Sequence, residues 1–396
     1  MTPHPDALPR LSPQALAAIS GTFVVGYMIA NVIPLIIAAM EADLGLEPVA
    51  AGALGTAMML CSAASGTLLA RRASRPNRYK LARAGLLVMA AGSLVAALAP
   101  LPWLAVAGVV VAGLGAGAGI ASGGAAIAAT ADPDRTSGLA ALVNRLLAAL
   151  LLLVVPLFGI SMASSFLALA ALALLGALIC RPLPEAPAAA GHLPVAVDRR
   201  TRILGLVLAA GACLWAVGED SLWAMSSGMG VDQAGLDGPG IGLLLSISTA
   251  AGLAGILVAT VLGSRLGRVV PLAVLLVLGA AAKLVTATTG DPAVFGTAFI
   301  AWNTIYAATF VTIVALSAAV HSSGRYAALL TSVYLFGSAL SPLFGAALVE
   351  AAGYAGFGLS TALISAAVAV PFLWVAVSLR RQPAPSSVPE EQFDAR

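Results

Sequence analysis

The strongest constraint on this chain is a succession of apolar stretches that continues through almost its whole length. Each stretch holds about 20 residues or more, the length of an α-helix that crosses the hydrocarbon core of a bilayer. A membrane β-barrel would instead show alternating segments of about 10 residues. We therefore predict an all-α membrane protein. Division at polar clusters and Gly/Pro turns gives twelve predicted transmembrane helices, at approximately 14–40, 48–70, 80–99, 103–130, 137–160, 163–180, 203–229, 238–263, 269–290, 293–320, 326–350 and 355–379.

The composition excludes an ordinary soluble protein. Hydrophobic residues make up 60% of the 396 residues and charged residues 9%, whereas about a quarter of the residues of a soluble domain are charged. The three cysteines, Cys61, Cys180 and Cys213, follow no disulfide or metal-site spacing. The sequence also contains no zinc-site spacing, phosphate-binding loop or Ser/His/Asp set. We accordingly expect no enzyme activity, no metal and no cofactor.

The basic residues are distributed unequally between alternate loops. If the N-terminus is cytoplasmic, every Lys and Arg except Arg145 and Lys283 falls in a cytoplasmic loop or terminus, and the outward loops carry acids instead. Membrane proteins insert with their basic loops inside. We expect a multi-pass protein of a bacterial inner membrane with both termini cytoplasmic. The basic residues then face anionic lipid and do not indicate a nucleic-acid partner.

One polar, Pro/Ala-rich stretch divides the chain. Residues 181–202 form the only long polar segment between predicted helices, and we interpret them as a cytoplasmic linker. The linker separates an N-terminal half, residues 1–180, from a C-terminal half, residues 203–380, each with six predicted helices. Residues 381–396 are polar and Pro-rich and are predicted to form a disordered cytoplasmic tail.

The two halves share a short repeat. Pro156-Leu-Phe-Gly159 in the fifth predicted helix recurs as Pro342-Leu-Phe-Gly345 in the eleventh. Pseudo-symmetric halves joined by a linker are typical of transporters that rock two halves about a site near the membrane midplane.

Two adjacent carboxylates, Glu219 and Asp220, interrupt the seventh apolar stretch. An acid near the bilayer centre costs roughly 2.5–3.5 kcal/mol, so it is a candidate for function. Glu219 shares a helix face with Trp215 and Trp223, whereas Asp220 lies about 100° round the helix. We predict that one acid exchanges a proton and so changes which side the cavity faces, and the tryptophan face favours Glu219. The alternative is that an acid pairs with a structural polar group.

Two basic residues also lie inside predicted helices. Arg145 is deep enough to bind an anion or form a salt bridge in a cavity, and a snorkelling side chain that reaches the inner headgroups is the alternative. Lys283 lies nearer the outer end of the ninth predicted helix, so we expect it to snorkel.

Polar and aromatic side chains in the first and tenth predicted helices complete the candidate site. Tyr27 and Asn31 share one helix face, as do Asn303 and Tyr306. Amides between aromatic walls suit a small amphipathic organic molecule, and interhelical hydrogen bonding is the alternative. The charge of the ligand stays open, since the acid suits a cation and Arg145 an anion. The predicted substrate-binding set is Tyr27, Asn31, Arg145, Trp215, Glu219, Trp223, Trp302, Asn303 and Tyr306.

Three glycine-containing motifs, two of them with arginine, link the chain to a known family. They are Gly66-Thr-Leu-Leu-Ala70-Arg71, Gly113-Leu-Gly-Ala-Gly117-Ala-Gly119 and Arg265-Leu-Gly267-Arg268. On these motifs the chain resembles the major facilitator superfamily over essentially its whole length, and it looks most like the bacterial twelve-helix drug and metabolite transporters.

The resemblance implies that helices 1, 4, 7 and 10 line a central cavity and that the protein is a monomer. The repeated Pro-Leu-Phe-Gly segments are similar to the family's antiporter motif, Gly-Pro-x-x-Gly-Gly, which favours export. The residues expected to act in the conformational switch are Gly66, Arg71, Pro156, Gly159, Arg265, Gly267, Arg268, Pro342 and Gly345.

Together these features predict a secondary transporter that moves a small organic solute by alternating access. We expect proton-coupled efflux, with protons, a small-molecule substrate and membrane lipid as partners. The alternatives are a proton symporter or uniporter that imports a metabolite, a membrane receptor that binds without transport, and a membrane enzyme.

Overall fold

The computed structural model describes residues 8–185, 198–321 and 325–380, and all regular structure in these residues is helical. The middle of the predicted linker and the C-terminal tail lie outside the described residues. The elements are α1 (Pro13–Ile19), the π-helical turn η1 (Ser20–Val24), α2 (Val25–Asn31), α3 (Ile33–Leu44), α4 (Pro48–Ala73), α5 (Arg78–Leu98), α6 (Pro102–Ala128), α7 (Pro133–Val154), the 3-10 turn η2 (Val155–Phe158), α8 (Met162–Ile179), α9 (Arg199–Asp232), α10 (Gly238–Leu266), α11 (Val269–Thr288), α12 (Pro292–Ala318) and α13 (Arg325–Arg380).

Within the described residues, eleven helical stretches are long and apolar enough to cross a membrane. The last of them belongs to α13, which bends at Gly353 (φ 64°, ψ 179°), a conformation that essentially only glycine adopts. The first predicted helix is interrupted at Val32 (φ −101°, ψ 13°), between α2 and α3. Pro34 follows two residues later, and its ring has no N–H and clashes with the carbonyl four residues before it.

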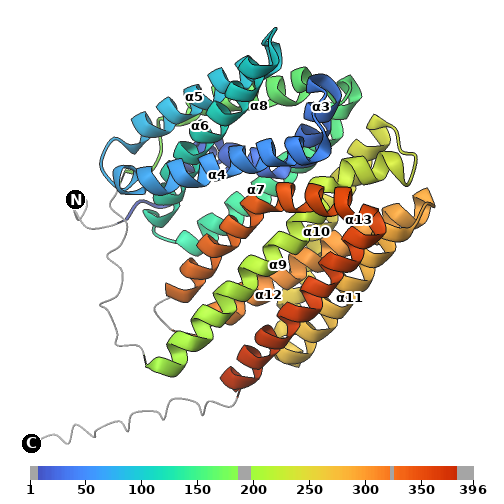
Figure 1. Ribbon diagram of the computed structural model, residues 1–396. Helices are drawn as coiled ribbons and strands as arrows, with labels where there is room; N and C mark the ends of the chain where they lie inside the picture. The colour runs from blue at the N-terminus through green and yellow to red at the C-terminus, as the bar shows by residue number, and fades with distance from the viewer. Residues whose placement is uncertain (1–7, 186–197, 322–324, 381–396) are drawn as a thin grey trace, which may run out of the picture.

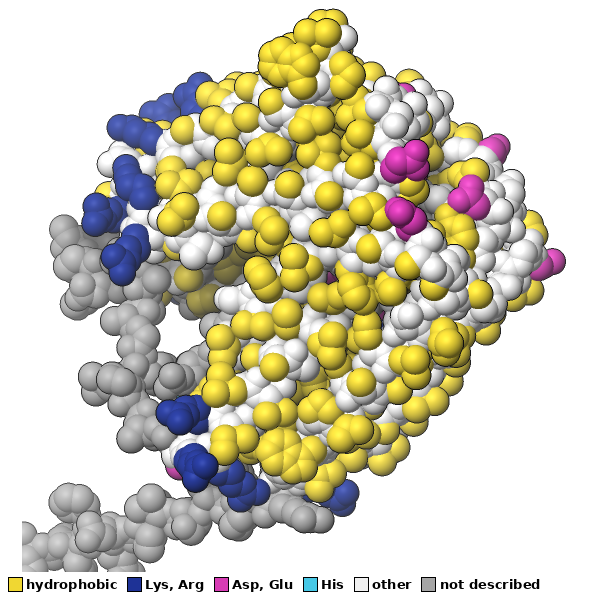
Figure 2. Space-filling model, in the orientation of Figure 1, with side chains coloured by type: hydrophobic (Ala, Val, Ile, Leu, Met, Phe, Trp, Pro, Cys, Tyr) yellow, Lys and Arg dark blue, Asp and Glu magenta, His cyan; other side chains and the backbone are white. Residues whose placement is uncertain are grey.

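The helices form two groups (Figure 1). Helices α1–α8 gather on one side of the molecule and α9–α13 on the other, and we call these the first and second groups. Lys and Arg side chains lie at one end of both groups and Asp and Glu side chains mainly at the opposite end (Figure 2). The basic end includes Arg71, Arg72, Arg135, Arg199, Arg268 and Arg380, and the acidic end includes Glu41, Asp43, Asp232, Asp237 and Asp291.

Both copies of the Pro-Leu-Phe-Gly repeat lie where the two groups meet. Pro342 of α13 packs on Gly52 of α4, where a Cβ would stand 2.6 Å from the Pro342 carbonyl oxygen. Pro156 of η2 packs on Gly242 of α10, where a Cβ would stand 2.8 Å from Pro156 Cγ. Each proline thus contacts a glycine of the other group, and each glycine allows the helices to approach closely.

These contacts leave the molecule closed on one side and open on the other. Near Pro342, the backbone N–H of Leu343 donates a hydrogen bond to Thr56 Oγ1 at 3.1 Å, which joins α13 to α4. At the basic end, by contrast, Figure 2 shows a hollow between the two groups. The structure therefore has its opening at the basic end.

We expect Gly52→Leu to open the acidic end, because a larger side chain would collide with the Pro342 backbone and overpacking costs about 1–3 kcal/mol. Spin labels at Ala42 and Val231, in a variant without the three native cysteines, report the distance across that end. The matched control is Gly138→Leu, since a Cβ at Gly138 meets nothing within 4 Å. If Gly52→Leu gives the same distance distribution as the control, the proline–glycine contact does not hold the acidic end closed.

Candidate functional site

A central cavity lies between the two groups, with about 830 Å³ of space unfilled by protein atoms, part of it open to solvent. Its walls come from α2, α3, α4 and α7 of the first group and from α9, α10, α12 and α13 of the second. Among the predicted substrate-binding residues, those that line it are Tyr27, Asn31, Arg145, Trp223, Trp302, Asn303 and Tyr306.

The first group contributes amides and a guanidinium. Asn31 Nδ2 of α2 donates a hydrogen bond to Asn144 Oδ1 of α7 at 2.9 Å, which joins the two helices in the cavity wall. The next residue, Arg145, is half-buried and forms no hydrogen bond or ion pair with any described residue. Sequence reasoning missed Asn144, although its position beside Arg145 within an apolar stretch was a usable signal.

The facing side of the cavity holds a neutral amide near the same guanidinium. Asn303 is 3% exposed, and its Oδ1 has no hydrogen-bond partner among the described residues. A Cβ on Gly252 of α10 would lie 3.3 Å from Asn303 Oδ1 and 3.4 Å from Arg145 Nη1. The absent side chain at Gly252 thus leaves room for both groups at the edge of the cavity.

Asp220 is the carboxylate of this cavity. Tyr334 of α13 donates its hydroxyl hydrogen to Asp220, with its oxygen 3.1 and 3.0 Å from Oδ1 and Oδ2. The Tyr306 hydroxyl then donates to the Tyr334 oxygen at 2.5 Å, and Trp215 stacks on the Tyr306 ring with centroids 5.4 Å apart. Tyr334 was missed from the sequence, where a lone tyrosine in an apolar stretch carried no signal.

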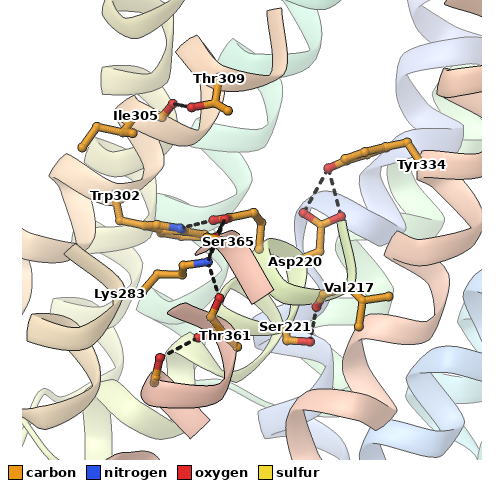
Figure 3. A network of polar contacts seen from close by, with 12 residues as sticks. Val217, Asp220, Ser221, Lys283, Trp302, Ile305, Thr309, Tyr334, Thr361 and Ser365 are labelled. Atoms are coloured by element: carbon orange, nitrogen blue, oxygen red, sulfur yellow. Dashed lines mark hydrogen bonds and ion pairs between the residues drawn. The ribbon is translucent and has the colours of Figure 1, made fainter. Parts of the chain in front are cut away.

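Glu219 points away from Asp220 into a buried ion pair. Lys283 Nζ of α11 lies 2.7 Å from Glu219 Oε1 and also donates to Ser365 Oγ at 2.6 Å and to the Thr361 carbonyl at 2.9 Å. Trp302 Nε1 donates to Glu219 Oε2 at 2.6 Å. Figure 3 shows the contacts of Lys283 and Trp302 in one cluster and the Asp220–Tyr334 contact in another, separate from it.

The prediction that Lys283 snorkels is wrong. Its side chain is completely buried, and the ammonium reaches inward to a carboxylate. The headgroups are one way to keep a lysine charge solvated, and here Glu219 supplies a counter-charge inside the protein instead.

The two adjacent acids therefore differ in environment. Neighbouring residues on a helix point about 100° apart, so one acid can face the cavity while the other faces a neighbouring helix. Both oxygens of Glu219 accept hydrogen bonds inside the second group. Trp215 and Glu219 do not line the central cavity, whereas Trp223 does and stacks on Phe299.

The expected switch residues lie at helix ends and helix contacts. A Cβ on Gly66 would stand 3.2 Å from the Gly117 carbonyl oxygen, so α4 and α6 approach closely there. Arg71 is exposed in the last turn of α4. Gly267 (φ 70°) ends α10 and the exposed Arg268 precedes α11, both at the basic end.

Of the remaining switch residues, Gly159 and Gly345 end the two copies of the repeat. Gly159 (φ 86°) terminates η2 with a backbone that favours glycine. Gly345 packs against Ser221 and Met225 of α9. The side chain of Arg265 lies outside the described residues.

The family of the chain follows from its sequence. The family model described as the Major Facilitator Superfamily matches residues 18–319. The chain belongs to this superfamily. The resemblance predicted from the motifs is thereby confirmed, and the membership indicates a multi-pass membrane transporter and not an enzyme. No curated protein matches the chain.

Solved structures with the same fold are also transporters. The chain is 15% identical to a bacterial homologue of the human lysosomal transporter Spinster in an inward-facing, unoccupied conformation, with a TM-score of 0.76 over 94% of this chain and 100% of that one. It is 13% identical to the nucleoside transporter NupG (TM-score 0.71, 91% and 99% covered). It is also 13% identical to the peptide transporter POT (TM-score 0.72, 94% and 96% covered). These likenesses show the fold.

We expect Lys283→Met to lower the melting temperature of the purified protein strongly, because removal of one partner from a buried ion pair costs about 3–5 kcal/mol. The double variant Glu219→Gln/Lys283→Met should recover much of that loss, since it leaves no unpaired charge. Thermal melts in one detergent compare them, with the exposed Lys80→Met as control. A Lys283→Met melt equal to that of the wild type would mean that the ion pair adds no stability.

Proposed function

We propose that this protein moves a small organic solute across a bacterial inner membrane by alternating access of the central cavity. The transport unit would be twelve membrane-crossing helices in two six-helix halves, residues 1–180 and 203–380. The bend of α13 at Gly353 supports the count of twelve helices, since it divides α13 into two helical segments. The position of the cavity between the two groups supports the two halves.

The basic end would face the cytoplasm, with both termini there. The clustering of Lys and Arg at that end supports this orientation. The opening at the same end then corresponds to an inward-facing state. Rocking of the halves about the cavity would close the basic end and separate the proline–glycine contacts at the acidic end.

The coupling we propose is proton antiport through Asp220. The observation that carries it is that the Asp220 carboxylate lies in the wall of the cavity that the solute would occupy. The groups that act on it are the hydroxyls of Tyr334, Tyr306 and Ser338 and the charge of the adjacent Glu219, and Arg145 of the first group lines the same cavity. A proton on Asp220 removes its charge, so proton and solute compete for one carboxylate. Competition of this kind produces exchange.

Glu219 has a different part in this proposal. Its contacts join α9 to α11 through Lys283, to α12 through Trp302 and to α13 through Ser365. These bonds would let the second half move as one body. They also hold the Trp302 indole in the cavity wall, so Glu219 acts as a positioning residue and Asp220 as the proton-exchanging one.

The direction we propose is export, with protons moving inward down their gradient. The alternative is symport or uniport that imports a metabolite. It would require a solute whose binding does not depend on an ionised Asp220. A cell that expresses the protein loses the solute under the first proposal and accumulates it under the second.

We expect Asp220→Asn to uncouple transport from protons, because asparagine cannot exchange a proton. The solute used is the compound that most raises the melting temperature from a panel of lipophilic cations, sugars, organic acids and amino acids. In proteoliposomes, its pH-driven flux should fall about tenfold or more in Asp220→Asn, and proton counter-movement seen with an internal pH dye should vanish.

The matched control is Glu47→Gln, an exposed acid whose side chain does not cap its helix. It should keep the coupled flux. Full pH-driven flux in Asp220→Asn would exclude antiport through Asp220, and proton movement in the same direction as the solute would establish symport.

A further inference from the structure

Among the residues that the structure describes, the lining of the central cavity carries one charge of each sign, and the two charges come from opposite groups of helices. Arg145 belongs to α7 of the first group and Asp220 to α9 of the second. They form no ion pair with each other, and Arg145 has no hydrogen bond to any described residue. Both nevertheless act electrostatically on the hydroxyl of Tyr306, which lines the same cavity.

The other charges near the cavity are already neutralised. Lys283 and Glu219 satisfy each other behind the Trp302 indole. The charges that the described part of the cavity wall leaves for a ligand are therefore one cation and one anion. A charged group removed from water without a partner is costly, so a ligand that compensates both groups binds better than one that compensates a single group.

A ligand with one charge would fit this cavity poorly. A monovalent cation would pair with Asp220 and be repelled by Arg145. A monovalent anion would pair with Arg145 and be repelled by Asp220. A zwitterion pairs with both groups and leaves the cavity neutral. Asn303 Oδ1, a buried acceptor near Arg145 Nη1 without a hydrogen-bond partner among the described residues, can accept from an N–H or O–H group of such a ligand.

The rest of the wall suits an apolar body between the two charged ends. Trp223 and Trp302 line the cavity, and both rings are held by neighbours, Trp223 by Phe299 and Trp302 by Glu219. Rings fixed in this way present flat apolar surfaces that favour aromatic or other planar groups.

We infer that the substrate is an amphipathic zwitterion, with an ammonium group on Asp220, a carboxylate or comparable anion on Arg145 and an apolar body against the tryptophans. This inference rests on the proposed transport function and names its substrate class. A bound zwitterion would connect the two halves, since its ends pair with opposite groups of helices. Protonation of Asp220 would release the ammonium end, which is the competition that antiport requires.

Matched compound triplets test the substrate class. Each holds a zwitterion, its carboxamide, which is only cationic, and its N-acetyl form, which is only anionic; tryptophan, phenylalanine and 4-(aminomethyl)benzoic acid supply three. Thermal shift and calorimetry on the purified protein at about pH 6.5, where the α-amino groups of the carboxamides stay mostly protonated, give the affinities. We expect at least one zwitterion to bind about tenfold or more tightly than both masked forms. The inference is overturned if none does, whether the masked forms bind equally or nothing binds.

Two variants assign the ends of the ligand. In Asp220→Asn, the affinity for the N-acetyl form should equal the affinity for the zwitterion. In Arg145→Gln, the affinity for the carboxamide should equal the affinity for the zwitterion. Glu47→Gln and Arg75→Gln, both at exposed positions, should keep the preference of the wild type. Ligand-free melting temperatures identify any variant that has not folded. An unchanged preference in a folded Asp220→Asn or Arg145→Gln overturns the assignment of that end.

The same preparation separates this inference from the proposed function. If a singly charged compound binds and crosses proteoliposomes in exchange for protons, the transport mechanism stands and the zwitterion assignment fails. If a zwitterion binds with the expected preference but is not transported, the substrate class stands and the transport function fails.

Discussion

The arrangement of the second group depends on the ion pair between Lys283 and Glu219. Hydrocarbon offers no water to either charge, so each must find its partners in the protein. The ammonium has three acceptors and the carboxylate has donors at both oxygens, supplied by α11, α12 and α13 around α9. With Glu219 held in this way, helix geometry turns Asp220 toward Tyr334 and the cavity (Figure 3).

A second constraint is the close approach of the two groups near the acidic end. Gly52 and Gly242 receive Pro342 and Pro156 in corresponding contacts, and the sequence repeat thus becomes a pair of equivalent interfaces. Apolar helices in lipid gain little from the hydrophobic effect, so their association depends on packing, which small residues allow. Such contacts are tight when formed but contain few polar bonds, which would suit the separation and re-formation that the proposed alternating access requires.

The central cavity depends on both constraints, which together determine the charged groups that line it. The ion pair removes one acid and one base from it, and Arg145 and Asp220 are left to face it from opposite sides. Proton exchange and the binding of a zwitterion would use the same carboxylate. Coupling would then need no other proton-exchanging group, because protonation of Asp220 would also weaken the binding of the solute.

The sequence by itself determined the helices and the candidate site region, and the tertiary structure decided which side chains meet. Span length, charge asymmetry and the two acids are local properties of the chain, and so the helices, the cavity residues Asn31, Asn303 and Tyr306, and the superfamily were predictable from it. The partners Lys283, Asn144 and Tyr334 were not. A transmembrane helix is apolar toward lipid and toward other helices alike, so its sequence does not show which neighbour a polar side chain faces. Only the packing turned Lys283 inward to Glu219 and left Asp220 in the cavity.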